Sequence, residues 1–167
     1  MGIFKNLFGG KKEEVKEVEL VAPMTGFATQ LENVDDPVFA QKMMGDGLAI
    51  EPSEGVVVSP VDGDIIQVFP TKHAIGIKAE NGAEILIHIG IETVGMKGEG
   101  FTTHVMEGDK VRKGDKLVTF DMALVTEKAK STVTPLIITN SDAMDVEPLA
   151  SGNVERGTTP FLKVTAK

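Results

Sequence analysis

The chain has 167 residues, a formal net charge of −8 and no cysteine. This length suits one ordinary domain with a substantial core. The negative charge argues against nucleic-acid binding, which needs a basic surface, and the lack of cysteine excludes disulfides and thiolate zinc sites. No segment resembles a signal peptide or reaches the length of a membrane span, so we expect a cytoplasmic protein.

The N-terminal segment differs in composition from the rest of the chain. Four apolar residues recur there at helical spacing, namely Ile3, Phe4, Leu7 and Phe8. The mixed charge run that follows cannot bury enough apolar surface to fold, so residues 1–18 are predicted to be a flexible tail. The apolar positions within residues 1–10 suit peripheral contact with a membrane surface. Residues 19–167 are predicted to form a single domain.

The predicted domain consists mainly of short apolar segments separated by Gly and Pro, which is typical of an antiparallel sandwich or barrel. Seven strands are predicted, at 55–58, 64–69, 73–79, 83–89, 116–120, 133–139 and 161–165. Two short helices are predicted after Asp36 and Asp121, because each aspartate can cap a run of helix-forming residues. The first of these helices is expected to end near Gly45. The expected fold class is therefore all-β, an antiparallel β-sandwich with short helical turns.

An internal repeat is also visible. A Pro-x-x-Gly turn between two apolar strands occurs twice, in ELVAPMTGFATQL and in VVVSPVDGDIIQV. Pro23 and Pro60 occupy the same place in the two segments, at the second position of the turn. The repeat predicts an architecture that is partly duplicated.

Two of the three histidines lie in strand-like segments on either side of Asn81-Gly82, which is a strong hairpin signal. A loop of these two residues alone places Ile75 opposite His88. His73 is then opposite Gly90, so both histidines face the same side as diagonal neighbours, roughly 7–8 Å apart at the backbone. A three-residue loop would shift the register by one and place them on opposite faces. We expect the two-residue loop, and two imidazole rings that meet.

Paired histidines suit four kinds of role. Both can be structural, and both can be zinc ligands, although a catalytic zinc needs a third protein ligand and His104 has no predicted place near them. They can carry out acid–base hydrolysis, which needs an orienting carboxylate. They can also transfer a phosphoryl group, one ring holding the group covalently while the other binds its oxygens.

The neighbours of the two histidines favour phosphoryl transfer. Thr71 lies two residues before His73 on the same side and can orient that ring. Leu86 and Phe69 share the parity of the histidines and are apolar. An apolar surrounding would keep water from a labile phosphoramidate and offer a docking surface.

The paired histidines belong to a longer segment, TKHAIGIKAENGAEILIHIGIETVGMKGEGF. This segment closely resembles the glucose-type enzyme IIA family of the bacterial phosphoenolpyruvate:sugar phosphotransferase system. Further segments match the family in the same order: DPVFAQKMMGDGLAIEP, SPVDGDI, EGDKVRKGD and STVTPLIITN. The resemblance runs from about residue 19 to the C-terminus. It implies a β-sandwich of the duplicated hybrid type and a phosphotransferase component that works through a phosphohistidine.

The resemblance also implies a role for each matching residue. His88 matches the histidine that accepts phosphate from the phosphocarrier protein HPr and passes it to a cysteine on the IIB domain of a glucose-type permease. His73 matches the second histidine, which stabilises the phosphoryl group. Thr71 matches the hydroxyl that fixes His73, and the Gly90 carbonyl matches the group that fixes His88. Positions implied to bind partners are Val38, Phe39, Phe69, Leu86, Asp36, Asp46 and Glu92.

The implied reaction requires no cofactor. Some members of the family bind an interfacial zinc ion through both histidines on a regulatory target, so His73 and His88 are also candidate zinc ligands shared with a partner. Two alternatives stay open: a zinc-dependent hydrolase, and a swinging-arm carrier, since EGDKVRKGDKL is similar to the turn of biotinyl and lipoyl domains. The hydrolases related in fold carry a His-x-His pair that this chain lacks, and the carriers have a Met where Gly98 follows Lys97.

Overall fold

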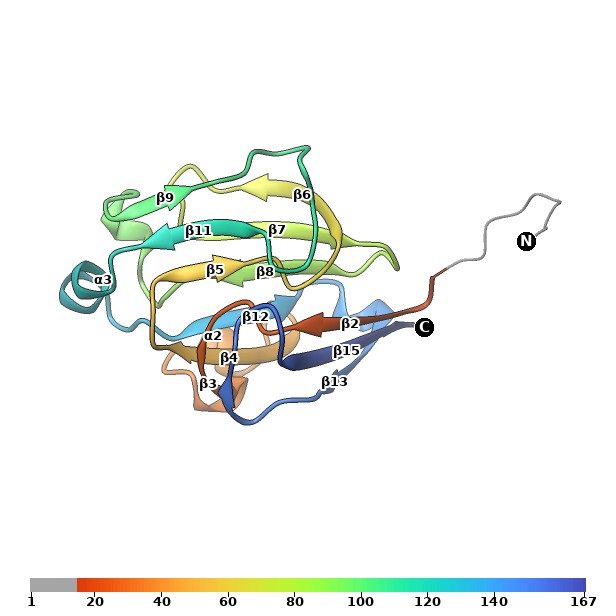
Figure 1. Cartoon of the computed structure of the whole chain (residues 1–167). Helices are drawn as coiled ribbons and strands as arrows, with labels where there is room; N and C mark the ends of the chain where they lie inside the picture. Colours follow the sequence, from red (N-terminus) through yellow and green to blue (C-terminus); the bar gives the residue numbers. More distant parts are fainter. Residues whose placement is uncertain (1–14) are drawn as a thin grey trace, which may run out of the picture.

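Antiparallel pairing of short strands rich in Val, Ile and Leu builds the molecule, and the computed structural model describes residues 15–167 of it (Figure 1). The largest sheet has eight strands, in the order β10 (Lys110–Val111), β6 (Gly63–Val68), β7 (Ala74–Ala79), β8 (Glu84–His88), β12 (Thr134–Ile138), β4 (Asp46–Pro52), β3 (Gly26–Gln30) and β14 (Gly152–Val154). A three-stranded sheet contains β5 (Val56–Val58), β11 (Lys116–Phe120) and β9 (Phe101–Thr103), and another contains β13 (Met144–Pro148), β15 (Pro160–Ala166) and β2 (Glu17–Val21).

The main core lies between the large sheet and the two small ones. Ile75 and Ile87 of the large sheet are fully buried in one apolar cluster with Leu117 and Phe161 of the small sheets. Removal of this apolar surface from water is the main source of the free energy that stabilises such a sandwich. The predicted all-β antiparallel sandwich is confirmed, and each of the seven predicted strands is present within two residues of its predicted ends.

Among residues 15–167, two α-helices and three short 3₁₀ helices interrupt the strands: α2 (Pro37–Ala40), α3 (Met122–Lys128), η1 (Leu31–Asn33), η2 (Val94–Met96) and η3 (Ser141–Ala143). The carboxylate of Asp36 accepts the N–H of Val38 at 2.9 Å, and that of Asp121 accepts the N–H of Leu124 at 3.1 Å. Both predicted caps are confirmed. Helix α2 nevertheless ends at Ala40, well before Gly45, because Lys42 has a left-handed backbone with φ of 56°.

The repeated Pro-x-x-Gly segments lie side by side and exchange hydrogen bonds. The N–H of Val21 donates to the carbonyl of Pro60 at 3.0 Å, and the N–H of Val58 donates to the carbonyl of Pro23 at 2.8 Å. These four residues occupy equivalent places in the two segments. The two bonds are therefore copies of one another, as a local two-fold axis requires.

The strand order extends this symmetry to the whole sheet. Strands β10, β6, β7 and β8 from one edge correspond to β14, β3, β4 and β12 from the other. Gly63 pairs with Val111 at one edge just as Gly26 pairs with Val154 at the other. The predicted internal duplication is confirmed, and its axis passes between β8 and β12.

Strand β2, the first strand of the described residues 15–167, begins before the predicted domain boundary. β2 starts at Glu17, because Val18 and Leu20 alternate with acidic residues and pack against the main core. Strand β2 therefore includes the last two residues of the predicted tail. Residues 1–14 lie outside the described part of the chain, so the tail and its membrane contact through residues 1–10 stay predictions. Among residues 15–167, no helix is both long and apolar enough to cross a membrane.

The β7–β8 hairpin has a three-residue loop, so the predicted register was wrong. The N–H of Ala79 donates to the carbonyl of Ala83 at 2.9 Å, and Ala74 rather than Ile75 pairs with His88. A type I′ turn needs a positive φ at both central residues, yet Asn81 is not left-handed and only Gly82 is, with φ of 90°. The amide of Asn81 instead donates to the backbone carbonyls of Val164 in β15 and of Lys16, which precedes β2, and these contacts favour the longer loop.

Candidate functional site

The two histidine rings meet despite the shifted register. Their centroids are 4.9 Å apart, with the ring planes at 80°. His73 lies in a bend one residue before β7 and follows Lys72, whose φ of 62° is left-handed. A residue in a bend does not follow the alternation of side chains along a strand. The predicted meeting of the rings is confirmed, but it depends on this bend and not on the predicted loop.

Each ring is held through its Nδ1 atom. Nδ1 of His88 lies 2.8 Å from the carbonyl oxygen of Gly90, and Nδ1 of His73 lies 2.6 Å from Oγ1 of Thr71. A carbonyl oxygen can only accept, so Nδ1 of His88 carries the hydrogen and Nε2 of the neutral ring keeps a free lone pair. The hydroxyl of Thr71 can donate or accept. The structure thus brings together the four residues predicted to form the reactive centre.

Apolar side chains surround the rings. The Phe39 ring lies 5.0 Å from His88 and the Phe69 ring lies 5.7 Å from His73, measured between centroids. Beneath the rings, Phe39 and Leu86 belong to a second buried cluster, which joins the η1–α2 segment to the large sheet. Phe39 and Leu86 are therefore buried, although the family resemblance implied that both bind partners. Of the predicted apolar partner-binding residues, Phe69 is half-buried and Val38 is exposed.

The three predicted acidic residues have different surroundings. Asp36 caps α2, and its charge is close enough to His88 to oppose the lowering of the pKa of that ring by burial. Glu92 has a left-handed backbone and lies 4.0 Å from the amino group of Lys130. Asp46 starts β4 and pairs with Lys42 at 3.4 Å, and no contact joins it to the rings among residues 15–167. Nothing in the sequence indicated that Lys130 lies near Glu92, because the two residues are far apart along the chain.

Burial keeps both rings neutral near neutral pH. Burial, and to a smaller degree the neighbouring His88, lowers the pKa of His73 to about 4. Burial also lowers the pKa of His88, against the opposing effects of the Gly90 carbonyl and Asp36. A neutral imidazole has the lone pair that a nucleophile or a metal ligand needs.

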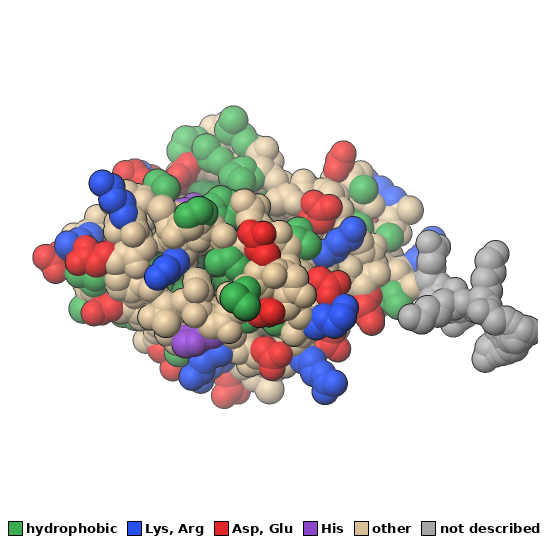
Figure 2. All heavy atoms as spheres, turned by 90° about the horizontal axis from the view of Figure 1, so that it is seen from above, with side chains coloured by type: hydrophobic (Ala, Val, Ile, Leu, Met, Phe, Trp, Pro, Cys, Tyr) green, Lys and Arg blue, Asp and Glu red, His purple; other side chains and the backbone are tan. Residues whose placement is uncertain are grey.

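The rest of the described chain offers no metal cluster and no basic surface stripe on the face in Figure 2. Within residues 15–167 no three His, Cys, Asp or Glu side chains gather closely enough to hold a metal ion. His104, the third histidine, contacts Oγ1 of Thr119 at 3.0 Å. Acidic and basic side chains alternate over the face in Figure 2, which has no continuous basic stripe, while hydrophobic side chains gather at one edge.

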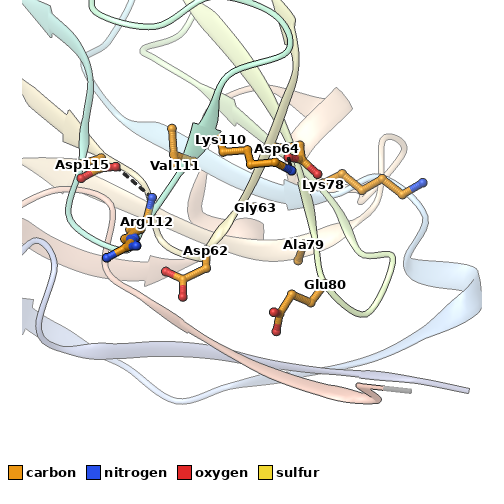
Figure 3. Close-up of a pocket in the computed structure, with 10 residues that line it drawn as sticks. All are labelled: Asp62, Gly63, Asp64, Lys78, Ala79, Glu80, Lys110, Val111, Arg112 and Asp115. Atoms are coloured by element: carbon orange, nitrogen blue, oxygen red, sulfur yellow. Dashed lines mark hydrogen bonds and ion pairs between the residues drawn. The ribbon is translucent and has the colours of Figure 1, made fainter. Parts of the chain in front are cut away.

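An open groove of about 430 Å³ lies near the hairpin loop (Figure 3). It is lined where β6, β7 and β10 meet, at the Ala79 end of β7, whereas His73 precedes the other end. Its charged side chains have both signs, and Lys110 pairs with Asp64 at 3.0 Å across it. The groove is separate from the histidine site.

Comparison with known proteins identifies the family. Residues 18–144 match the model of the family described as phosphoenolpyruvate-dependent sugar phosphotransferase system, EIIA 1. The chain belongs to this EIIA family. Membership makes this EIIA a phosphoryl carrier of the sugar phosphotransferase system, so the hydrolase and swinging-arm alternatives are rejected.

Individual relatives resemble this EIIA over nearly its whole length. A Bacillus anthracis protein named PTS system glucose-specific EIIA component is 58% identical over 167 residues, which cover 99% of this chain and 100% of the relative. A Staphylococcus epidermidis protein of the same name is 48% identical over 166 residues, which cover 98% and 99%. The solved structure of glucose permease IIA from Mycoplasma capricolum superposes with a TM-score of 0.84 at 39% identity, covering 91% of this chain and 99% of that one.

Proposed function

We propose that His88 of this EIIA accepts a phosphoryl group from HPr and passes it to the IIB domain of a glucose-type permease. The observation that carries the proposal is the pair of neutral rings in contact, with Nδ1 of His88 bound to a carbonyl and Nε2 left as the nucleophile. Glucose is the proposed sugar because the relatives carry it in their names.

The transfer is balanced in atoms and charge. The Nε2 lone pair of His88 attacks phosphorus, an N–P bond forms, and the bond between phosphorus and the HPr atom that carries it breaks with its electron pair returning to that atom. In the onward step a cysteine thiolate of IIB attacks the same phosphorus, and Nε2 leaves as a neutral imidazole nitrogen. The Gly90 carbonyl keeps the Nδ1 hydrogen in place through both steps.

His73 supplies hydrogen bonding to the phosphoryl oxygens. When the Thr71 hydroxyl donates to Nδ1 of His73, the ring hydrogen is on Nε2, which can then donate to a phosphoryl oxygen. Donors that are already in place stabilise the charge spread over phosphoryl oxygens in the transition state. Phe39 and Phe69 limit the access of water to the phosphoramidate.

The surroundings of the site suit protein partners that combine apolar and basic groups. Val38 is exposed beside the buried Phe39, and Asp36 and Glu92 supply negative charge at the same end of the molecule. A zinc ion at His73 and His88 would need further ligands from such a partner, since residues 15–167 offer no third one nearby. Phosphoryl transfer itself needs no metal in this proposal.

Labelling with phosphoenolpyruvate, enzyme I and HPr tests the proposal. We expect acid-labile phosphate on the wild-type protein, its loss in His88→Ala, and its retention in His104→Ala and in the presence of a chelator. His73→Gln should accept phosphate but stall in transfer to IIB. Undiminished labelling of His88→Ala would refute the acceptor assignment, and normal onward transfer by His73→Gln would remove His73 from the reaction.

A further inference from the structure

The peptide group that orients His88 is itself held at both ends. Its carbonyl, on Gly90, accepts from Nδ1 of His88 at 2.8 Å, and its N–H, on Ile91, donates to the carbonyl of Ser131 at 2.9 Å. Gly90 has a φ of 74° and no room for a side chain, because a Cβ would lie 2.7 Å from Cγ2 of Thr93. Only glycine meets both requirements without strain.

The preceding peptide group, between Ile89 and Gly90, is bound by two threonine hydroxyls. Oγ1 of Thr93 donates to the carbonyl of Ile89 at 2.6 Å, and the N–H of Gly90 donates to Oγ1 of Thr134 at 3.3 Å. Thr134 in turn donates its own hydrogen to the carbonyl of Thr132 at 3.0 Å, which leaves its lone pairs for Gly90. Thr93 and Thr134 are the only two buried threonines among residues 15–167.

We infer that Thr134 is a positioning residue for phosphoryl transfer, because it holds the backbone of Gly90 so that the Gly90 carbonyl keeps the hydrogen of His88 on Nδ1. Glycine has a wide range of backbone conformations, so loss of this bond removes one of the contacts that fix Gly90 and lets its carbonyl shift relative to the ring, although the Ile91 N–H still donates to Ser131. The hydrogen of His88 could then move to Nε2, and the nucleophilic lone pair would be lost. The inference rests on the proposed function of His88 and deepens it.

Thr134→Val tests the inference, since valine keeps the shape of threonine and removes the hydroxyl. We expect the rate of phosphoryl transfer from HPr to fall about tenfold or more, the size of effect known for groups that orient a reactive ligand. Nitrogen-15 NMR of the histidine rings should show a larger population of His88 with hydrogen on Nε2. Thr134→Ser should restore both properties. Thr132→Val is the matched control, because Thr132 serves the network through its backbone carbonyl.

Each outcome decides the inference. A normal rate in folded Thr134→Val, or a slow rate with an unchanged tautomer, would overturn it. If Thr134→Val does not fold, amide exchange in the wild-type protein decides: exchange at Gly90 as slow as at Ile87 supports the inference, and exchange at the rate of an exposed loop contradicts it. A wild-type protein that takes up no phosphate would refute the proposed function instead, while the tautomer measurement would still test Thr134.

Discussion

His73 is a buried residue with a titratable ring, so its protonation makes the stability of the folded protein depend on pH. Its pKa is about 4 in the folded protein, because burial and the neighbouring His88 disfavour its charge, against 6.5 for an unperturbed histidine. The unfolded chain therefore binds more protons than the folded one between these two pH values. Above pH 6.5 the titration of His73 does not change the free energy of unfolding. As the pH falls from 6.5 to 4, protonation of the unfolded chain lowers this free energy, and below pH 4 the decrease is complete.

Replacing His73 should flatten this pH dependence. One pKa unit corresponds to about 1.4 kcal/mol, so protonation of His73 lowers the free energy of unfolding by roughly 3 kcal/mol across the window. His73→Gln has no such proton. We expect urea unfolding, followed by circular dichroism at pH 7.5 and 4.5, to show a loss smaller by roughly 2 kcal/mol in the variant. Equal losses in both proteins would show that His73 is not held neutral by the fold.

Single residues also mark the limit of what could be inferred from the sequence. Period-two patterns and turn residues located the strands and the caps Asp36 and Asp121, because these depend on local chemistry. The position of His73 depends on the left-handed backbone of Lys72, which lysine has no intrinsic tendency to adopt. The hydroxyls that hold Gly90 come from Thr93 and Thr134, and the latter bond joins segments 44 residues apart. Such contacts follow from tertiary structure and have no local signal.

At the scale of elements, the β7–β8 hairpin shows how tertiary contacts override turn propensity. Asn81-Gly82 predicts a two-residue loop, but the amide of Asn81 donates to the carbonyls of Lys16 and Val164, each at 3.0 Å. These bonds tie the loop to β15 and to the residue that precedes β2. The same bonds explain why the register shifted by one, since the loop is held by the neighbouring sheet as well as by its own turn.

Asn81→Asp should therefore destabilise the protein without changing its chemistry. A carboxylate cannot donate, and it would face two carbonyl oxygens, so we expect the free energy of unfolding to fall by about 1–3 kcal/mol. The loop is at the end of the hairpin away from the histidines, so phosphate uptake from HPr should be unchanged. Urea unfolding and the labelling assay check the two halves of this prediction. Glu80→Gln, an exposed change in the same loop, is the control, and an equally large effect there would contradict the assigned role of Asn81.

At the scale of the whole molecule, a duplicated fold carries one reactive site. The symmetry that relates β7 to β4 and β8 to β12 places Asp46 where His73 lies in the other half, and Ile137 where His88 lies. The connections differ as well: residues 31–45 join β3 to β4 and cover the large sheet, whereas residues 69–73 make the equivalent link between β6 and β7. The longer connection supplies Phe39 to the ring of His88. One half thus provides the histidines, and the other packs Phe39 against His88.

The two halves should consequently unfold together. Ile87 of β8 pairs with Leu136 of β12 on the symmetry axis, and it is fully buried in the core that both halves share. We expect Ile87→Ala to lower the free energy of unfolding by about 2–5 kcal/mol, still in a single transition whose calorimetric and van't Hoff enthalpies agree. Calorimetry suits this chain, which has no Trp or Tyr to report by fluorescence.

Ile66→Ala, at a site 44% exposed on β6, should change stability by only about 0.5 kcal/mol. Two separate transitions in Ile87→Ala would show that the halves are independent, and the site, built from both, would then be able to open without unfolding of the whole domain.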